Sequence, residues 1–367
     1  MSVQKRSGPV PADMSNGTVD LPEWWVYRGV GEPLQDNLRP DRGLPPAPPW
    51  RTFDGGPVTS GSPPKDDRGD MERRLGRGGA ISPSMVDHAE VNVVNAALVL
   101  RRPLLVTGPP GAGKSTLAFQ VANELRLGRV IRWHVTSNTT FKSGLYNYDA
   151  IARAEAVAVA SRRGEDVGGD RIGDFVRLGP LATAFLPTRL PRVLLIDELD
   201  KSEIDLPNDL LEIFEAGTFT IPELERIASH TPTAEVFTND PDHRATITGG
   251  RVTCRAFPIV VITSNGERDF PPAFLRRCLQ LEMKPPNAQK IAAIVDAHFA
   301  RAVKGMELPD AVRDEVIREF TASGEAGALS ADRVLDALFL VTSGNFDREN
   351  PLWPELKDAL WQRSRAV

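Results

Sequence analysis

The chain of 367 residues contains only two cysteines, Cys254 and Cys278. Two thiols can build neither a disulfide framework nor a four-cysteine zinc site, so both of these classes of protein are excluded. So low a cysteine content suits a reducing compartment, and we expect a cytoplasmic protein.

Long hydrophobic runs are also missing from the sequence. The longest ones, such as 96–100 and 258–262, are far shorter than the roughly 20 apolar residues that a helix needs to span a bilayer. Residues 1–17 contain no apolar core of the kind found in secretory signals. We therefore expect neither a membrane span nor a membrane partner.

The sequence has no excess of positive charge. Its 44 Lys and Arg stand against 49 Asp and Glu, which gives a formal net charge of −5. This balance argues against a broad basic surface, and no basic stripe with interleaved aromatic residues is visible, so we expect no nucleic-acid partner. The length and the hydrophobic content of 41% are those of a globular protein with two or three modest domains.

Residues 1–80 differ in composition from the rest of the chain. Of the 31 prolines, 12 lie before residue 65, and no periodic apolar pattern is sustained there. We expect a Pro/Gly-rich N-terminal arm that is partly ordered. Its segments 21–27 and 44–53 carry three of the six tryptophans, so we expect them to dock on the folded domain or on a partner. Packing against the domain is the simpler of these two interpretations.

The stretch Gly-Pro-Pro-Gly-Ala-Gly-Lys-Ser-Thr at 108–116 joins an apolar run, 104–107, to a helical pattern over 117–125. A strand, a glycine-rich loop and a helix in this order indicate a phosphate-binding P-loop, because glycines let backbone N–H groups close around phosphate oxygens. Lys114 would place its charge at the β- and γ-phosphates, and Ser115 would bind magnesium. The predicted nucleotide-binding residues of this loop are Gly108, Pro109, Gly111, Ala112, Gly113, Lys114, Ser115 and Thr116.

Two acids, Asp197 and Glu198, end a later apolar strand. Downstream of a P-loop, the first can hold the water shell of Mg²⁺ and the second can act as a general base toward water. Asn265 follows another buried strand, 257–263, where its amide could orient water or sense the γ-phosphate. These positions are our candidates for the metal-binding and catalytic groups.

Three arginines are candidates for further phosphate contacts. Arg276 and Arg277 lie just past the last buried strand without an adjacent acid, and arginine there could reach the phosphate of a neighbouring subunit. The alternative is a plain surface pair on a helix. Arg333 lies in the first turn of a helix, where the macrodipole disfavours a cation. This favours a phosphate contact, with an ion pair to Asp332 or Asp336 as the alternative.

Other elements follow from apolar spacing and turn residues. We expect a polar loop over 137–149, an alanine-rich helix over 150–161, a flexible segment over 162–170, a hairpin around Gly249 and Gly250, and helices capped by Asn287, Asp310 and Ser330. His134 lies on a strand and His298 on an apolar helix face. We interpret both histidines as packed residues and not as catalytic or metal-binding ones.

The order of these features resembles the AAA+ ATPases: a P-loop GPPGAGKST, an acidic LLIDE, an asparagine after VVITS, a double arginine and a helical region with an arginine. More narrowly, TSNTTFKSGLYNYDAIAR, GDFVRLGPL, IDELDKSEIDLPNDLLEIFEAG and CRAFPIVVITSNGERDFPPAFLRRC are similar to the MoxR-type branch. That branch belongs to the clade with inserts at helix two and before sensor one. The resemblance covers about residues 80–345.

The resemblance implies an α/β fold, namely a three-layer αβα P-loop domain with a parallel sheet over 81–285, followed by a small all-α lid over 286–367. The family inserts would fall at about 137–175 and 235–257 and would contact the client protein. It further implies ATP and Mg²⁺ as cofactors, a ring that is usually hexameric, and chaperone-like remodelling of a protein partner, often together with a von Willebrand factor A domain protein.

Residue by residue, the resemblance implies Walker A roles for Lys114 and Ser115 and Walker B roles for Asp197 and Glu198. It implies sensor one at Asn265, an arginine finger at Arg276 or Arg277, and sensor two at Arg333. The finger usually follows Asp-Arg-Phe, whereas this chain has Arg-Arg-Cys, so the choice between the two arginines stays open. Sensor two usually follows a proline, whereas the helix here opens with Ser-Ala-Asp-Arg.

Two other functions remain alternatives at this point. A P-loop small-molecule kinase would use the same loop, although the paired acids and the helical C-terminal region argue against it. A nucleotide-gated scaffold of a bacterial defence or signalling module would bind ATP with little turnover. GTP use stays open, although the sequence contains no Asn-Lys-x-Asp motif to bind guanine.

Overall fold

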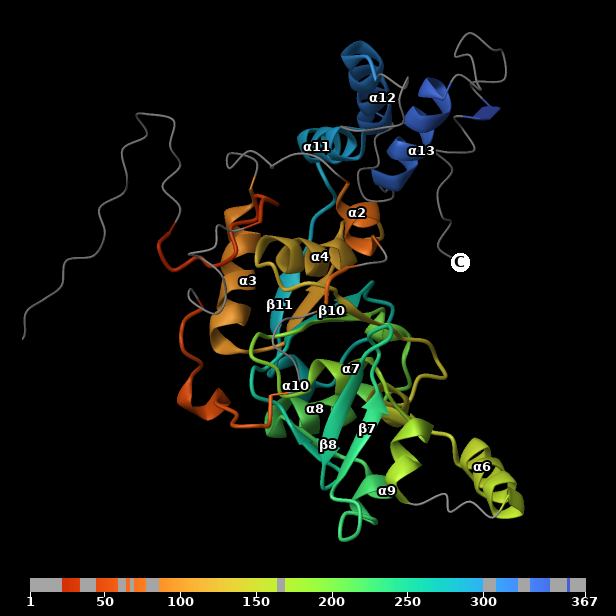
Figure 1. Cartoon of the computed structure of the whole chain (residues 1–367). Helices are drawn as coiled ribbons and strands as arrows, with labels where there is room; N and C mark the ends of the chain where they lie inside the picture. The colour runs from red at the N-terminus through yellow and green to blue at the C-terminus, as the bar shows by residue number, and fades with distance from the viewer. Residues whose placement is uncertain are drawn as a thin grey trace, which may run out of the picture.

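The computed structural model describes residues 22–33, 44–58, 64–66, 69–76, 86–163, 169–299, 308–322, 331–343 and 355–356. Two β-sheets form its body, with a group of helices above them (Figure 1). The first sheet has five parallel strands in the order β11-β1-β10-β5-β2. These strands are β1 (Leu104–Thr107), β2 (Ile131–His134), β5 (Val193–Asp197), β10 (Ile259–Ser264) and β11 (Leu279–Glu282).

Helices cover both faces of this sheet: α3 (His88–Leu100), α4 (Lys114–Glu124), α7 (Pro180–Ala184) and α8 (Leu206–Ala216). Alternate strand residues face opposite layers, so that Leu104 packs with α3 and α4 while Leu105 packs with α7 and α8. Strands buried on both sides need apolar residues at every position, which explains the unbroken apolar runs. The predicted three-layer α/β fold with a parallel sheet is confirmed.

The second sheet has six strands in the order β3-β4-β7-β8-β9-β6. They are β3 (Tyr146–Tyr148), β4 (Val176–Leu178), β6 (Thr218–Thr220), β7 (Thr233–Phe237), β8 (Arg244–Thr248) and β9 (Arg251–Thr253). Gly249 and Gly250, with φ of 61° and 70°, turn the chain between β8 and β9, as predicted. The prediction of a polar loop over 137–149 was wrong, because Thr140 and Ser143 cap the short helix α5 (Phe141–Leu145), which leads into β3.

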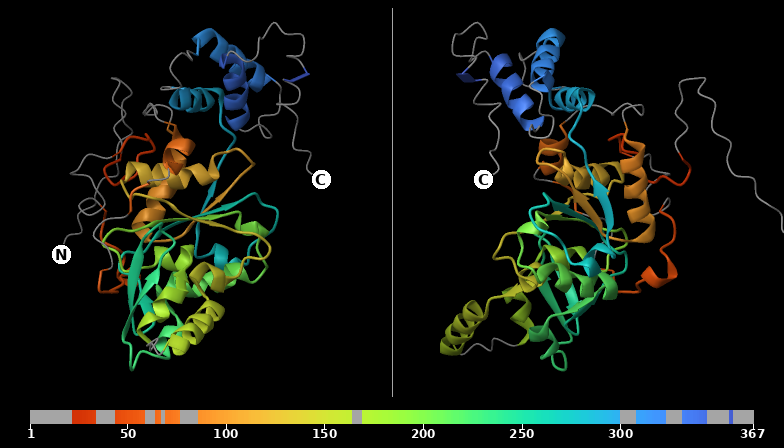
Figure 2. Two further views of the ribbon diagram at one scale, coloured as in Figure 1. Left: turned by 45° about the vertical axis from the view of Figure 1, so that its right-hand side comes forward. Right: turned by 180° about the vertical axis from the view of Figure 1, so that it is seen from behind.

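The predicted alanine-rich helix is α6 (Ala150–Arg163). It projects away from the body, as Figure 1 and the right-hand view of Figure 2 show, and Ala160 is its only buried residue. The predicted flexible segment lies partly outside the described residues. Its last two residues begin the 3-10 helix η4 (Gly169–Phe175).

The N-terminal arm docks on the αβα body. Trp25 donates from Nε1 to Asn92 Oδ1 over 2.7 Å, and the backbone N–H groups of Val26 and Tyr27 donate to Asn95 Oδ1 on α3 over 2.7 and 2.9 Å. All three arm residues are buried. This confirms the predicted docking for the first aromatic segment, whereas Trp50 of the second is 78% exposed. The arm also forms the 3-10 helix η2 (Pro49–Arg51) and helix α2 (Asp70–Leu75).

The buried carboxylate of Glu124 lies at the end of α4 and is held by the arm. The backbone N–H groups of Arg28 and Gly31 donate to it, the second over 3.3 Å. Gly29 and Gly31 have positive φ, so successive N–H groups turn inward and form an anion-binding nest. Burial raises the pKa of Glu124 to about 7, although the N–H groups of residues 28–31 oppose the shift.

Three helices after β11 pack on one another: α11 (Ala288–Phe299), α12 (Asp310–Ala322) and α13 (Ala331–Thr342). Their apolar side chains form a separate small core that includes Val295, Val316 and Leu338. Asn287 accepts from Lys290 N over 2.8 Å and so caps α11, as predicted. Asp310 is the first residue of α12, and Ser330 lies outside the described residues. Within the described ranges, no helix has both the length and the apolarity needed to cross a membrane.

Candidate functional site

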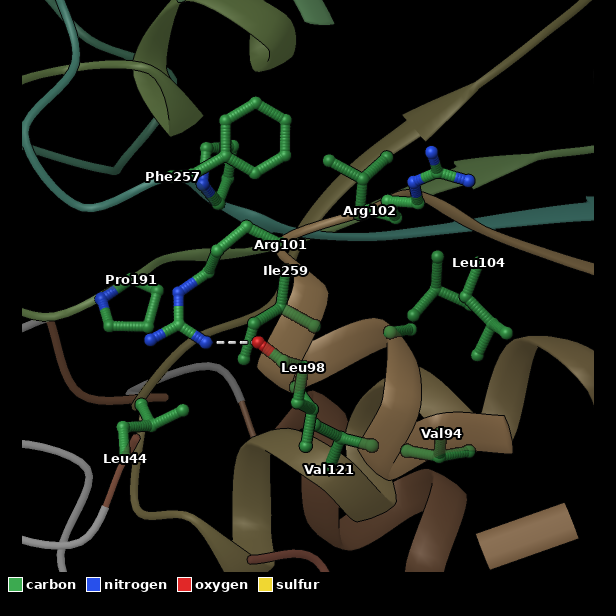
Figure 3. Close-up of a pocket in the computed structure, with 14 residues that line it drawn as sticks. Leu44, Val94, Leu98, Arg101, Arg102, Leu104, Val121, Pro191, Phe257 and Ile259 are labelled. Carbon is green, nitrogen blue, oxygen red and sulfur yellow. Dashed lines mark hydrogen bonds between the residues drawn. The ribbon is translucent and has the colours of Figure 1, made fainter. Parts of the chain in front are cut away.

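Two cavities differ sharply in what they can hold. One, of about 20 Å³, lies where Leu44 of the arm meets α3 and β10 (Figure 3). Arg101 closes it by donating to the Leu98 carbonyl and, over 2.7 Å, to Pro45 O. This volume suffices for about one water molecule. The other cavity, of about 420 Å³, opens at the carboxyl edge of the parallel sheet, beneath α11 and α13.

The larger cavity is the candidate site, because ligands of parallel α/β sheets bind outside the carboxyl ends of the strands. Residues 110–116 line it together with Asp197, Glu198, Thr263 and Asn265. The strand register aligns these groups, since Thr107 lies opposite Ser264 across β1 and β10. We refer to this cavity as the cleft.

The P-loop has the backbone conformation that its glycines predict. Gly108, Gly111 and Gly113 have φ of 141°, 77° and 90°. At Gly108 a side chain is also sterically excluded, because a Cβ there would lie 2.3 Å from the Met283 carbonyl oxygen. The loop leads directly into the N-terminus of α4, whose free N–H groups and dipole favour an anion. The loop therefore fits a phosphate chain.

Lys114 is the first residue of α4, and its ammonium group lies against the loop. Its Nζ donates to Gly108 O over 2.7 Å and to Pro109 O over 2.9 Å. Burial lowers the pKa of Lys114, while Asp200 and Asp197 nearby oppose the shift. Both P-loop residues 108 and 109 therefore contribute through their carbonyl groups, and neither lines the cleft.

Asp197 is the most densely bonded group of the cleft. Its Oδ1 accepts from Ser115 Oγ over 2.6 Å and from Thr263 Oγ1 over 2.8 Å. Its Oδ2 accepts from Arg132 through Nη2 at 2.7 Å and Nε at 3.2 Å. Burial alone would raise the pKa of Asp197, but the hydrogen bonds from Ser115, Arg132 and Thr263 outweigh it. The net pKa lies below the ordinary value, so the carboxylate is charged.

The oxygen atoms of Ser115 and Asp197 fit Mg²⁺, which prefers oxygen ligands and uses one or two protein groups plus substrate phosphates. In the described part of the chain, no cluster of three or more His, Cys, Asp or Glu side chains could hold a metal ion alone. A magnesium ion at Ser115 and Asp197 would therefore depend on nucleotide oxygens.

Glu198 adopts a left-handed backbone conformation, with φ of 63° and ψ of 48°. Its N–H donates to Thr263 Oγ1 over 2.9 Å, so the same threonine contacts both acids. The Glu198 carboxylate lies 3.1 Å from Lys201 Nζ and 3.9 Å from His134 Nδ1. Strained conformations of this kind are concentrated at functional sites, and this one directs Glu198 to the cleft.

Asn265 lines the cleft at the end of β10. Its loop is anchored by Asp200, whose Oδ2 accepts from the N–H groups of Asn265 at 2.9 Å and Glu267 at 3.1 Å. Asp200 is only 3% exposed, and its other oxygen has no hydrogen-bond partner. Asp200 was not predicted as a site residue, although its spacing of three residues from Asp197 could have indicated it.

The candidate arginines lie outside the cleft of their own chain. Arg276 is exposed at the end of α10 (Pro272–Leu275), and its Nε donates to Pro272 O over 3.2 Å. Arg277 is half-buried and forms an ion pair with Glu215 of α8. Arg333 of α13 does not line the cleft, although its neighbour Asp332 does.

Several residues of the cleft were missed from the sequence, among them two arginines and two histidines. Arg132 and His134 reach it from β2, Arg74 from the N-terminal arm, and His298 from α11. The prediction that both histidines are packed was wrong for His134, whose side chain is 55% exposed, whereas His298 is half-buried and lines the cleft. Burial lowers the pKa of His298, while a backbone hydrogen bond with Arg74 opposes the shift. Only the alternation of exposed and buried residues along β2 could have indicated Arg132 and His134.

The fold and the cleft together define a nucleotide-binding P-loop protein of the α/β class. Residues 103–278 match the AAA domain of the dynein-related subfamily. This part of the chain is therefore similar to AAA domains of the AAA+ ATPase type, a domain type that binds nucleotide, generally hydrolyses ATP and commonly assembles into rings. The match extends from just before β1 to Cys278. No curated protein sequence matches the chain at a significant level.

Proposed function

We propose that this protein binds and hydrolyses ATP as a ring oligomer, a hexamer, and uses the cycle to remodel a protein partner. The observation that carries the proposal is the convergence of Lys114, the Ser115–Asp197 pair and Glu198 on one cleft beside a phosphate-sized cradle. Each group has a separate task in ATP hydrolysis. A binding-only site would need the cradle but not the Glu198 carboxylate.

In the proposed reaction, Glu198 accepts a proton from a water molecule, whose oxygen bonds to the γ-phosphorus. The bond from that phosphorus to the β–γ bridging oxygen breaks, and ADP and phosphate are released. Magnesium would be held by Ser115 and Asp197 and would supply charge neutralisation at the phosphates. Lys114 would turn from the loop carbonyls to the phosphates, and Asn265 would orient the water.

Ring assembly would complete the site. Arg276 lies outside its own cleft, and in the described part of the chain no carboxylate pairs with it. Arg277 is engaged by Glu215, so Arg276 is the better candidate for an arginine finger that reaches a neighbouring subunit's phosphate. Arg333, at the start of α13, would act as the sensor of the bound phosphate from the helical side.

The assignment of regions follows from the same proposal. Residues 286–367 would form the lid over the cleft, and residues 1–80 the arm. The inserts at about 137–175 and 235–257 would contact the client, and the projection of α6 away from the body supports this for the first insert. The family resemblance makes a von Willebrand factor A domain protein our candidate partner.

The test compares wild-type protein with Glu198→Gln and Lys114→Ala. We expect Glu198→Gln to bind ATP as wild type does while phosphate release falls by about 10²–10⁴-fold, since only the base is removed. Lys114→Ala should lose nucleotide binding. Light scattering with and without ATP and Mg²⁺ should show ATP-dependent assembly.

Three results would overturn parts of the proposal. Undiminished phosphate release by Glu198→Gln would exclude Glu198 as the base. Phosphate on an added small-molecule acceptor, in place of free phosphate, would indicate a kinase. ATP-driven assembly with background phosphate release would indicate the nucleotide-gated scaffold, which the ion pair between Glu198 and Lys201 favours because the carboxylate of the proposed base is then already engaged.

A further inference from the structure

We propose that Arg132 is a built-in counter-cation of Asp197 that gives way when Mg²⁺ binds with nucleotide, so that the site holds nucleotide with or without the metal. The inference rests on the proposed function, because it assumes that the cleft binds ATP. It concerns a residue outside the P-loop and outside the acidic pair.

Arg132 contacts a different oxygen of Asp197 from the one that the two hydroxyl groups contact. Ser115 and Thr263 both donate to Oδ1, whereas Oδ2 accepts, among the described residues, only from Arg132, through two nitrogens at 2.7 and 3.2 Å. A two-point contact of a planar guanidinium with a carboxylate is stronger and more directional than a contact of an ammonium group. Arg132 therefore covers the oxygen of Asp197 that the hydroxyl groups leave free.

The charge balance explains why such a cation is needed. Asp197 is 4% exposed, and a buried carboxylate without a countercharge is costly. Lys114 does not fill this role, since its ammonium group is bonded to the carbonyls of Gly108 and Pro109. Among the described residues, Arg132 is the one cation bonded to Asp197. When nucleotide brings Mg²⁺ to Ser115 and Asp197, the ion supplies two positive charges. Asp197 then no longer needs Arg132 as its countercharge, and the Arg132 side chain can move away.

The Arg132 side chain also has space in the cleft into which it can move. It lies on β2, the edge strand of the parallel sheet, and its side chain is 44% exposed to the cleft. Arg74 lines the same cleft and is close enough that Arg132 helps to lower its pKa, after the larger effect of burial. An anion between these two guanidinium groups would reduce the repulsion between their like charges. A phosphate chain supplies that anion, so the released Arg132 guanidinium would contact phosphate oxygens.

This arrangement predicts a specific coupling between metal and nucleotide. Without metal, Arg132 neutralises Asp197 and nucleotide still binds. If Arg132 is replaced by a neutral residue, the bare Asp197 carboxylate repels phosphate in the absence of Mg²⁺. The same replacement removes the competitor of Mg²⁺ at Asp197. Metal-free binding should therefore weaken, while the magnesium requirement should shift to lower concentration.

The experiment measures binding of a fluorescent, non-hydrolysable ATP analogue to the full chain, first in EDTA and then across a magnesium titration. The variants are Arg132→Gln and Arg132→Lys, with Arg226→Gln as a matched control, because Arg226 is exposed and distant from the cleft residues. Loss of a charged hydrogen-bonding partner should weaken EDTA binding by Arg132→Gln by about tenfold. Its half-saturating magnesium concentration should fall several-fold, with Arg132→Lys intermediate and the control unchanged.

The outcomes separate this inference from the proposed function. A wild-type chain that binds no analogue even with magnesium overturns both. Binding by wild type and Arg132→Gln with the same ratio of affinities in magnesium and EDTA overturns this inference alone, since a merely structural role would lower both affinities together. If Arg132→Gln does not fold, as judged by thermal unfolding, the ratio measured for Arg132→Lys decides in the same way.

Discussion

The hydroxyl of Ser115 donates a 2.6 Å hydrogen bond to Asp197, although 82 positions of sequence separate the two residues. The bond joins the first turn of α4 to the end of β5, across the carboxyl edge of the sheet. It makes the two predicted magnesium ligands one unit.

Ser115→Ala should therefore weaken nucleotide binding in the presence of Mg²⁺ but not in its absence. We expect the affinity for ATP in Mg²⁺ to fall about tenfold, because one of two protein ligands to the ion is lost, while the affinity in EDTA changes little. Fluorescence titrations in both conditions check this, with the exposed Ser137→Ala as the control. An equal loss in both conditions would mean that Ser115 shapes the loop and does not bind the metal.

Arg276→Ala and Arg277→Ala should have different effects on phosphate release. If Arg276 is the finger, its removal should lower phosphate release about 10³-fold or more without loss of ATP binding. Mixing it with Glu198→Gln subunits should restore part of the activity, since a complete site can form between the two variants. Arg277→Ala should instead loosen the contact with Glu215 and leave turnover largely intact. Phosphate assays on both variants and their mixtures provide the measurement, and the reverse pattern would assign the finger to Arg277.

We expect Asp240 to stabilise the contact between the two sheets. It accepts from Arg129 over 2.9 Å and from Arg192 over 2.8 and 2.9 Å, and it is 5% exposed. Replacing it by Ala leaves the buried Arg192 and the half-buried Arg129 without their carboxylate partner, which costs about 3–5 kcal/mol. Urea unfolding of Asp240→Ala measures this loss. Asp242→Ala, at an exposed neighbouring position, is the control, and a similar stability of the two variants would refute the prediction.

Glu124 should make the stability of the protein depend on pH. Its folded pKa of about 7 lies above the ordinary value of 4.5, so the folded chain binds this proton more tightly than the unfolded chain does. The contribution, about 3 kcal/mol, is fully present below pH 4.5 and is lost progressively as the pH rises from 4.5 to about 7. Urea unfolding between pH 4.5 and 8 should show this decline in wild type and a flatter profile in Glu124→Gln. Parallel profiles would contradict it.

Much of the parallel sheet could be predicted from the sequence, because strands buried on both faces leave unbroken apolar runs such as 193–196. The same holds for the P-loop, whose glycines have few other uses at that spacing. In the second sheet, the hairpin of β8 and β9 was predicted, whereas β3 and β4 were missed because they are short and half-exposed. Residues 140–148 have the polar composition of a loop, yet Thr140 and Ser143 use their side chains to cap a helix.

The histidines illustrate why cleft residues outside the motifs were not predictable. His134 and His298 both have apolar neighbours in sequence, which is typical of packed residues. The first lies at the end of an edge strand, and the second lies beside the arm, and each lines the cleft. Neither the strand order nor the position of the arm is encoded in local spacing.

By itself, the sequence determined the order of the chemical groups: a cradle, a lysine and a hydroxyl after one strand, two acids at the end of a second strand and an asparagine after a third. It could do so because a strand followed by a particular loop is a local pattern. Only the tertiary structure decided which cation bonds to Asp197. Arg132 holds that place because β2 lies beside β5 in the sheet, and ionic contacts depend on distance in space and not on separation in sequence.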